Sequence, residues 1–320
     1  MEFCKWHDPS RRRVTSLPVM PGGRPRRKLH RVLSRALFVA LLSISARAFA
    51  QTDTPTEHRL TWQPGWRRVN GVEYALTTGL FATFTAFRFL PPIENALWTR
   101  PVLLDDATRN GLRAHSRGGR SAAGHVSDAV ALLGYLPPLL IDPMLVAGIG
   151  DENPDVAWQL FVISTQSYAI TITLNSVAKR VFARRRPYAI SCAKDPEYSD
   201  ACDSADRFRS FYSGHSAITA TSAGLICAHH THVPLYGGGN IDRLTCAAAL
   251  AGMLATGTLR IVADKHWHSD VVVGHLLGFA VGYLLPTLVY YKSFKSEPEE
   301  GSVSAPLASA PPLLGTSFAF

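Results

Sequence analysis

Six mostly apolar segments, each long enough to form a helix, limit the folds open to this chain. Strand-like alternation of polar and apolar residues is scarce, and no internal repeat is apparent. The sequence therefore predicts an all-α fold, arranged as a six-helix bundle. The segments cover about 73–90, 129–150, 156–178, 214–230, 244–262 and 270–291.

Segment 271–291 is a good candidate for a membrane span, because its side chains are apolar apart from His275, Thr287 and the tyrosines. About twenty apolar residues suffice to cross the hydrocarbon core of a bilayer. The other segments are interrupted; 129–150, for example, contains Asp142 and two adjacent prolines. Buried helices of a soluble bundle have a similar composition. We expect a membrane-embedded bundle, with a soluble periplasmic bundle as the alternative.

The two ends of the chain differ from its middle. Residues 1–50 combine basic runs, the apolar run ALFVALLSIS and the small-residue pattern AFA, which together predict a secretory signal peptide with a long basic n-region. An uncleaved anchor is the alternative. Residues 51–70 and 293–320 predict flexible segments on either side of a helical domain at 71–292. This indicates the bacterial cell envelope: the inner membrane with a periplasm-facing site, or the periplasm itself.

The net charge of +9 does not by itself indicate a nucleic-acid partner, because much of it lies in the first 35 residues. The five cysteines do not form a disulfide scaffold. Cys192 and Cys202 lie ten residues apart in a polar stretch, and in an oxidising compartment they could form a disulfide; two unpaired thiols are the alternative. Cys227 and Cys246 lie in apolar stretches and are interpreted as core residues.

A first charged cluster lies in the run KRVFARRRP, where Lys179 and Arg186 are seven residues apart. On a helix this spacing places both on one face, and Pro187 ends the helix there or just before. Arg offers a planar fork to two phosphate oxygens and Lys a point charge. The alternative is a cytoplasmic flank of a membrane span, a part that the other arginines of the run, such as Arg184, could also play.

A second cluster, Ser213-Gly214-His215, opens another helix-like run. Serine is a good N-cap, and glycine lets the backbone approach a ligand closely. The free amides at a helix start point at an anion. His215 then lies where it could protonate a leaving oxygen. Taken alone, the same residues would fit an ordinary capped helix with a surface histidine.

A third cluster consists of Arg260, His266 and Asp270 in LRIVADKHWHSD. His266 and Asp270 are four residues apart, so on a helix they would be neighbours. A carboxylate on one ring nitrogen leaves the other free for attack or proton transfer. Arg260 falls on a different helical face from His266, so a break at residues 263–265 is needed between them. A solvated histidine–aspartate pair at a helix start is the alternative.

Together the clusters contain three cations, a hydroxyl, a glycine amide and two histidines. That set suits binding a phosphate and attacking it covalently without a metal ion. No zinc-binding spacing such as HExxH or CxxC occurs, so no metal or other cofactor is expected.

With the three clusters in this order, the chain resembles the type 2 phosphatidic acid phosphatase family, which shares a superfamily with bacterial class A acid phosphatases and vanadium haloperoxidases. The resemblance runs from about Ser164 to Leu285. Tyr212 and Leu259 depart from the usual residues beside the motifs. In membrane members of the family, the fold is a six-helix bundle with the site at its outer face.

The resemblance implies that His266 is the nucleophile that forms a phosphohistidine, with Asp270 orienting it. It implies that His215 is the general acid for the leaving group. The phosphate cradle would then consist of Lys179, Arg186, Ser213, the Gly214 amide and Arg260.

The expected function is a metal-independent phosphatase acting on a phosphomonoester or pyrophosphate of a lipid. The alternatives are a soluble periplasmic acid phosphatase, a lipid phosphotransferase and a vanadate-dependent haloperoxidase. The oligomeric state is not predicted. A cleaved signal followed by three crossings, at 73–90, 129–150 and 156–178, would place the first cluster inside the cell, in conflict with a site at the outer face. Either segment 73–90 does not span, the helices do not all cross, or the signal is not a cleaved one.

Overall fold

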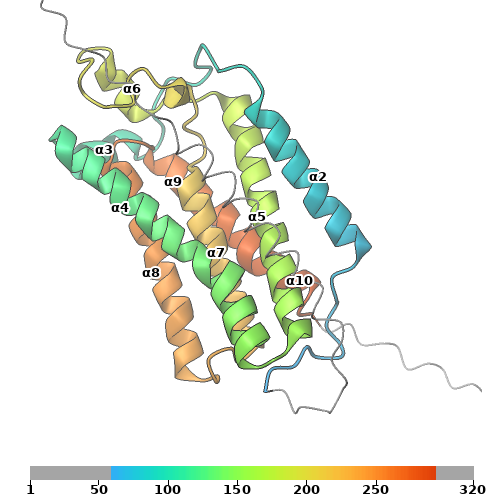
Figure 1. The fold of residues 1–320 in the computed structure, drawn as a ribbon. Helices are drawn as coiled ribbons and strands as arrows, with labels where there is room; N and C mark the ends of the chain where they lie inside the picture. The colour runs from blue at the N-terminus through green and yellow to red at the C-terminus, as the bar shows by residue number, and fades with distance from the viewer. Residues whose placement is uncertain (1–58, 293–320) are drawn as a thin grey trace, which may run out of the picture. The chain divides into compact units, whose positions relative to one another are not determined.

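The computed structural model describes residues 59–292, which form a helical bundle without a β-strand in that range (Figure 1). The predicted signal peptide, residues 51–58 and the predicted C-terminal tail at 293–320 lie outside the described residues. The elements are α2 (Gly71–Arg88), α3 (Asp105–Leu112), α4 (Arg117–Leu136), η1 (Pro137–Gly150), α5 (Pro154–Phe182), α6 (Pro187–Cys192), η2 (Ala205–Phe208), α7 (Gly214–His232), α8 (Asn240–Val262), α9 (His268–Phe279), η3 (Ala280–Leu284) and α10 (Leu285–Val289).

Each of the six predicted segments is helical over most of its length, so an all-α architecture is confirmed for the described residues. The count of six is not confirmed. The short helices α3 and α6 were not expected, because neither carries an apolar run. Segment 129–150 proved to be the second half of a longer helix, formed by α4 and η1, that begins at Arg117.

Helix α7 lies at the centre of the bundle and packs against α4, α5, α8 and α9 (Figure 1). Three glycines at intervals of four, Gly274, Gly278 and Gly282, form the face that α9 and η3 turn to α7. A Cβ added to Gly278 would lie 2.0 Å from the carbonyl oxygen of Ala217. Only glycine therefore allows this approach of the two backbones, a packing mode common between membrane helices.

Three helices in the described range are long and apolar enough to cross a membrane: Arg117–Gly150, Asn240–Val262 and His268–Val289. Large apolar side chains are exposed along all three, including Ile149, Leu254 and Leu276. Segments 73–90, 156–178 and 214–230 are not among the three. Helix α5, which contains segment 156–178, carries many buried polar side chains.

Residues 59–70 are irregular, as expected, but they are packed against the bundle rather than free. Leu60 and Trp62 are buried in the core, and the Leu60 amide donates a 2.9 Å hydrogen bond to Asp151. Trp62 and Trp66 both contact the ring of Tyr291. This aromatic contact holds the start of the domain against its end.

Cys227 and Cys246 form a disulfide that joins α7 to α8. Their interpretation as unpaired core residues was therefore wrong. Both lie in apolar helical stretches, and composition alone does not show that the two facing positions are close enough to bond.

Candidate active site

The first cluster is divided between the end of α5 and the segment that follows it. Lys179 lies in the last turn of α5, which ends at Phe182 because Ala183 adopts a left-handed conformation with φ 38°. Arg186 therefore lies beyond the helix, four residues after its end. The prediction that Lys179 and Arg186 share one helical face was wrong, because Arg186 belongs to the extended segment after α5 and contacts His266 from there.

The second cluster forms the start of α7. Ser213 is buried and caps the helix, its side chain accepting a hydrogen bond from the amide of Ser216. A Cβ on Gly214 would lie 2.9 Å from the side-chain oxygen of Asn175 and 3.3 Å from Nζ of Lys179. Glycine is thus required for the amino end of α7 to approach Lys179 closely. The free backbone amides at the start of α7 therefore lie beside the ammonium group of Lys179.

The third cluster spans two helices and the loop between them. Helix α8 ends at Val262 and α9 begins at His268, so the predicted break between Arg260 and His266 is confirmed. His266 lies in the loop and not on the same helix as Asp270. The side chain of His266 is buried, and its Nε2 lies 3.2 Å from Nη1 of Arg186.

Asp270 contacts His266 less directly than predicted. Its Oδ2 is 3.6 Å from Nδ1 of His266, longer than a hydrogen bond. The same oxygen accepts hydrogen bonds from Oγ of Ser210 at 2.5 Å and from the Trp267 amide at 3.0 Å. The backbone oxygen of Asp270 also accepts from the Ser213 amide at 3.0 Å, which links the second and third clusters.

Burial lowers the pKa of His266 well below its ordinary value, and the positive charges of Arg186, Arg260 and Lys179 lower it further. The ring is therefore neutral at neutral pH. Because a guanidinium can only donate, Nε2 of His266 is the acceptor in its contact with Arg186, and the proton resides on Nδ1. A neutral imidazole with its lone pair directed at a cluster of cations is suited to nucleophilic attack on an anion that the cluster binds.

Asp128 of α4 is a site residue that the sequence did not indicate. Its Oδ1 accepts a 2.6 Å hydrogen bond from Nη1 of Arg260 and lies 3.0 Å from Nε2 of His215. Arg260 also donates to Oγ of Ser127 at 2.8 Å. Burial and the charge of Arg260 lower the pKa of His215 to about 3, whereas the carboxylate of Asp128 acts in the opposite direction.

A second unexpected group is a buried arginine between two carboxylates. The guanidinium of Arg184 donates to Oδ1 of Asp270 and to Oδ2 of Asp105, both at 2.5 Å, and it lies 3.8 Å from the centre of the Trp98 ring. Its side chain is only 1 % exposed. Arg184 is therefore not a membrane-flanking charge, as one reading of its sequence run suggested. It joins α3 to the start of α9.

Helix α3 also holds the loop at residues 263–267, which carries His266. Arg109 donates to both carboxylate oxygens of Asp264, at 2.7 and 2.8 Å, two residues before His266. The hydroxyl of Tyr198 donates to the same carboxylate at 2.9 Å. Tyr198 belongs to the long segment between the first two clusters, so this segment contacts the loop that carries His266.

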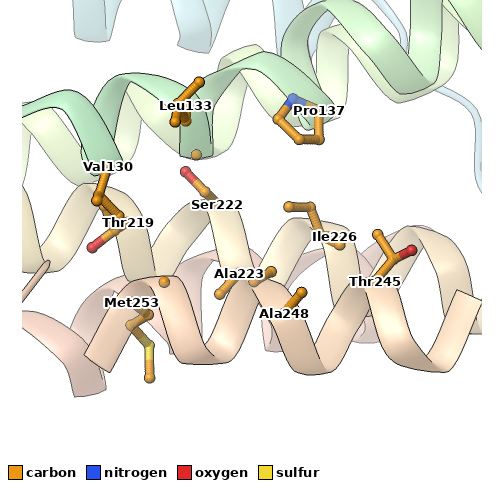
Figure 2. A pocket seen from close by; sticks show the side chains of 13 residues that line it. Val130, Leu133, Pro137, Thr219, Ser222, Ala223, Ile226, Thr245, Ala248 and Met253 are labelled. Carbon is orange, nitrogen blue, oxygen red and sulfur yellow. The ribbon is translucent and has the colours of Figure 1, made fainter. Parts of the chain in front are cut away.

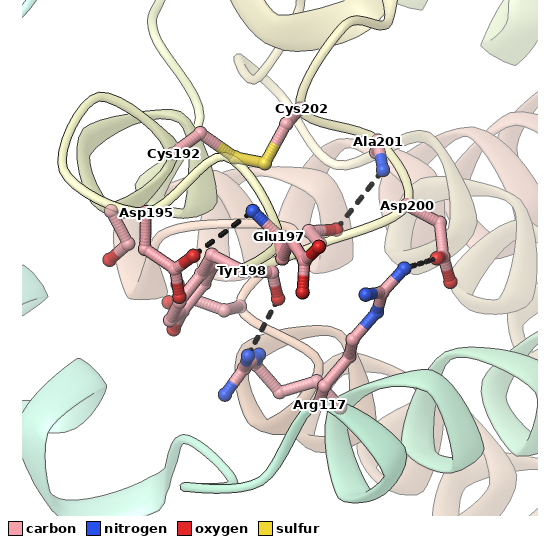
Figure 3. Close-up of a disulfide and its surroundings, with 12 residues drawn as sticks. Arg117, Cys192, Asp195, Glu197, Tyr198, Asp200, Ala201 and Cys202 are labelled. Atoms are coloured by element: carbon pink, nitrogen blue, oxygen red, sulfur yellow. Dashed lines mark hydrogen bonds and ion pairs between the residues drawn. A yellow bond between two sulfur atoms is a disulfide. The ribbon is translucent and has the colours of Figure 1, made fainter. Parts of the chain in front are cut away.

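Cys192 and Cys202 form a disulfide in that segment (Figure 3). Asp200, beside it, pairs with Arg117 at the start of α4, and the Tyr198 carbonyl accepts a 2.6 Å hydrogen bond from Arg120. The disulfide thus closes the segment whose Tyr198 contacts Asp264 in the loop at residues 263–267.

All eight predicted site residues therefore gather at one end of the bundle, together with Asp128, Arg184 and Asp105. Asp128 and Asp105 carried no recognisable signal, because the charged side chains that they pair with, such as Arg260 and Arg184, lie far away in the sequence. In residues 59–292, no group of three or more His, Cys, Asp or Glu side chains is arranged to hold a metal ion.

Comparison with known proteins identifies the region that carries the clusters. Residues 160–294 match the family model of the PAP2 superfamily, which confirms the resemblance. No curated protein matches the chain. One similar solved structure is a transmembrane PAP2 type phosphatidylglycerolphosphate phosphatase from Bacillus subtilis. It is 18% identical, the similarity covers 68% of this chain and 94% of that one, and the TM-score is 0.40.

Proposed function

We propose that this chain, whose residues 160–294 match the PAP2 superfamily, is a membrane-embedded phosphatase that cleaves a lipid phosphate ester or pyrophosphate without a metal ion. The observation that carries the proposal is the neutral ring of His266 beside Arg186, with Lys179 and Arg260 near enough to lower its pKa. Fixed cations can bind a phosphoryl group and stabilise the charge of its transition state.

In the first half of the reaction, Nε2 of His266 attacks phosphorus while the bond to the leaving oxygen breaks. The cradle of Lys179, Arg186, Arg260 and the amides at the start of α7 holds the three other phosphate oxygens. His215 gives its proton to the leaving oxygen. Because its pKa is low in the free protein, the charge of a bound phosphate must raise that pKa before His215 can carry the proton.

In the second half, water attacks the phosphohistidine and the P–N bond breaks, which restores His266 and releases phosphate. His215, neutral after the first half, takes a proton from the attacking water. Asp270 does not need to move in this scheme. It stays bound to Arg184, Ser210 and the Trp267 amide, and so fixes the start of α9 beside the ring of His266.

The exposed apolar side chains on Arg117–Gly150, Asn240–Val262 and His268–Val289 favour a membrane protein over a soluble phosphatase. In water, such continuous apolar surfaces would promote association. In a bilayer they would face lipid tails, and a lipid substrate could reach the site without leaving the membrane.

The test is phosphate release by the purified full chain from a panel of lipid phosphates, with and without EDTA, and with vanadate. Activity should persist in excess EDTA, because Lys179, Arg186 and Arg260 stabilise the charge of the phosphoryl group that a metal ion would otherwise stabilise. Vanadate, which adopts the geometry of the transferring phosphoryl group, should inhibit. Loss of turnover on chelation with recovery in magnesium would contradict the metal-free mechanism, and absence of release from every substrate would contradict the phosphatase itself.

A further inference from the structure

Asp264 lies two residues before His266 and adopts a left-handed backbone conformation, with φ 57°. Glycine takes this conformation without strain, whereas most other residues avoid it and aspartate and asparagine are the usual exceptions. The side chain of Asp264 is fully buried. A buried carboxylate in an uncommon backbone conformation persists only where its surroundings hold it, so its partners indicate what the residue does.

The carboxylate of Asp264 is held from two parts of the chain outside its own loop. It accepts two hydrogen bonds from Arg109 of α3 and one from the hydroxyl of Tyr198. The side chain of Arg109 is itself only 12% exposed, so water screens the pair little. A bidentate pair of this kind fixes the orientation of both groups as well as their separation. Asp264 is thus an anchor of the loop that carries His266.

Arg109 also holds the segment that carries Arg186. Its Nη2 donates a 3.1 Å hydrogen bond to the carbonyl of Pro187, the residue directly after Arg186. The carbonyl of Asp264 in turn accepts from the amide of Tyr188 at 3.1 Å. The pair of Arg109 and Asp264 therefore joins the chain that follows Arg186 to the loop that contains Asp264.

This junction bears on the contact between Arg186 and His266. Nη1 of Arg186 donates to the carbonyl of Lys265 at 3.0 Å, and the same nitrogen lies 3.2 Å from Nε2 of His266. Lys265 directly follows Asp264 in the sequence. A shift of the loop at Asp264 would therefore displace both groups that this nitrogen contacts. The direction of the proposed attacking atom depends on where the loop is held.

A second anchor holds the loop on the other side of His266. Nε1 of Trp267 donates to the carbonyl of Arg185 at 2.8 Å, and the Trp267 amide donates to Asp270. His266 thus lies between one anchor two residues before it and another directly after it. Loss of the carboxylate of Asp264 would leave the second anchor in place, so the ring of His266 could turn while the bundle remains folded.

We propose that Asp264 is a positioning residue, which keeps Nε2 of His266 in line with the phosphate that Arg186 binds. Its carboxylate acts through Arg109 and Tyr198 and does not touch the substrate. The inference rests on the proposed phosphatase function. The competing explanation is a buried ion pair that only stabilises the fold. Positioning affects the geometry of attack in every folded molecule, whereas a purely structural pair affects only how many molecules are folded.

The test compares vanadate and inorganic phosphate as ligands of the purified full chain in detergent. Both anions fit the cradle, but vanadate alone adopts the five-coordinate geometry of phosphoryl transfer, which requires Nε2 of His266 to be in line. Calorimetric titration gives the Kd of each anion and the number of sites per molecule, which counts the folded molecules. The ratio of the vanadate Kd to the phosphate Kd therefore reports geometry, since a change of charge beside the cradle affects both anions.

Asp264→Gly removes the carboxylate and keeps a residue suited to the left-handed conformation. Combining it with Arg109→Met also removes the buried cation that would otherwise be unpaired, which protects folding. Tyr198→Phe removes one hydrogen bond and leaves the ion pair intact. The control is Ile226→Ala, because Ile226 is buried beside an apolar cavity between α4, α7 and α8 (Figure 2). It should lower the Tm without moving the loop.

In Asp264→Gly and in the double variant the ratio should rise at least about tenfold, because a misplacement of about 1 Å near reacting groups can cost about 10²-fold. Tyr198→Phe should show a smaller rise, and Ile226→Ala an unchanged ratio with a lower Tm. An unchanged ratio in the double variant would overturn the positioning role. So would a loss of binding sites in both Asp264 variants with a normal ratio in Tyr198→Phe. If the wild type bound neither anion, the proposed function would fail as well.

Discussion

The contact between His266 and Arg186 sets the strongest expectation at the scale of single residues. Because Nε2 of His266 is the proposed attacking atom, His266→Ala should lower turnover by at least about 10³, the scale seen when a covalent nucleophile is removed. His268→Ala, two residues along the chain and outside the proposed site, is the matched control and should remain near wild type. Near-normal turnover by His266→Ala would remove this residue from the mechanism.

Asp128 allows a test that separates proton transfer from phosphate binding. Its carboxylate contacts both His215 and Arg260 and favours the protonated form of His215. In Asp128→Asn, turnover of an alkyl phosphate should fall tenfold or more, because general acid catalysis typically contributes 10²–10⁴-fold. Turnover of p-nitrophenyl phosphate, whose leaving group needs no proton, should fall much less.

The same variant should bind inorganic phosphate more tightly, since a negative charge beside the cradle is removed. Equal losses on the two esters, with unchanged phosphate inhibition, would show that Asp128 only maintains the structure. The measurements are steady-state rates on both esters and the inhibition constant of phosphate.

At the scale of helices, the position of His215 relative to His266 depends on the contact between α7 and α9. In Gly278→Ala the new Cβ would meet the backbone of Ala217, so the two helices must separate. We expect a loss of about 1–3 kcal/mol in unfolding free energy and reduced turnover. Gly79→Ala on α2 is the control, because a Cβ there meets nothing within 4 Å. Thermal unfolding in detergent measures both, and equal stability of the two variants would contradict the close packing.

The helices could be predicted because apolar segments of that length have few other structures open to them. The end of α5 could not, since Ala183 is left-handed where a glycine would have signalled the turn. The roles of Asp105, Asp128 and Arg184 could not be predicted either, because their partners come from other helices. The motifs indicated eight residues that lie together in the structure, whereas the side chains that pair with them, such as Asp105 and Asp128, depend on tertiary structure.

At the scale of the whole molecule, the disulfide Cys192–Cys202 reports on which side of the membrane the site lies. The segment that it closes contacts Asp264, in the loop that carries His266, through Tyr198, so this segment and the candidate site share a compartment. With a periplasmic site, both cysteines should resist alkylation in whole cells and then, after a reductant, react with a membrane-impermeant maleimide. Labelling only after the inner membrane is permeabilised would place the site in the cytoplasm.

The buried group of Asp105, Arg184 and Asp270 also decides whether the candidate site could be moved to another protein. Residues 160–294 include the arginine and one carboxylate, but α3 supplies the other. Breaking a buried ion pair by removing one partner typically costs about 3–5 kcal/mol. A fragment cut to the matched region would lack Asp105, and with it Asp128 and Arg109. The three motif clusters are thus not sufficient by themselves, and a design that moves them to another scaffold must also include α3 and α4.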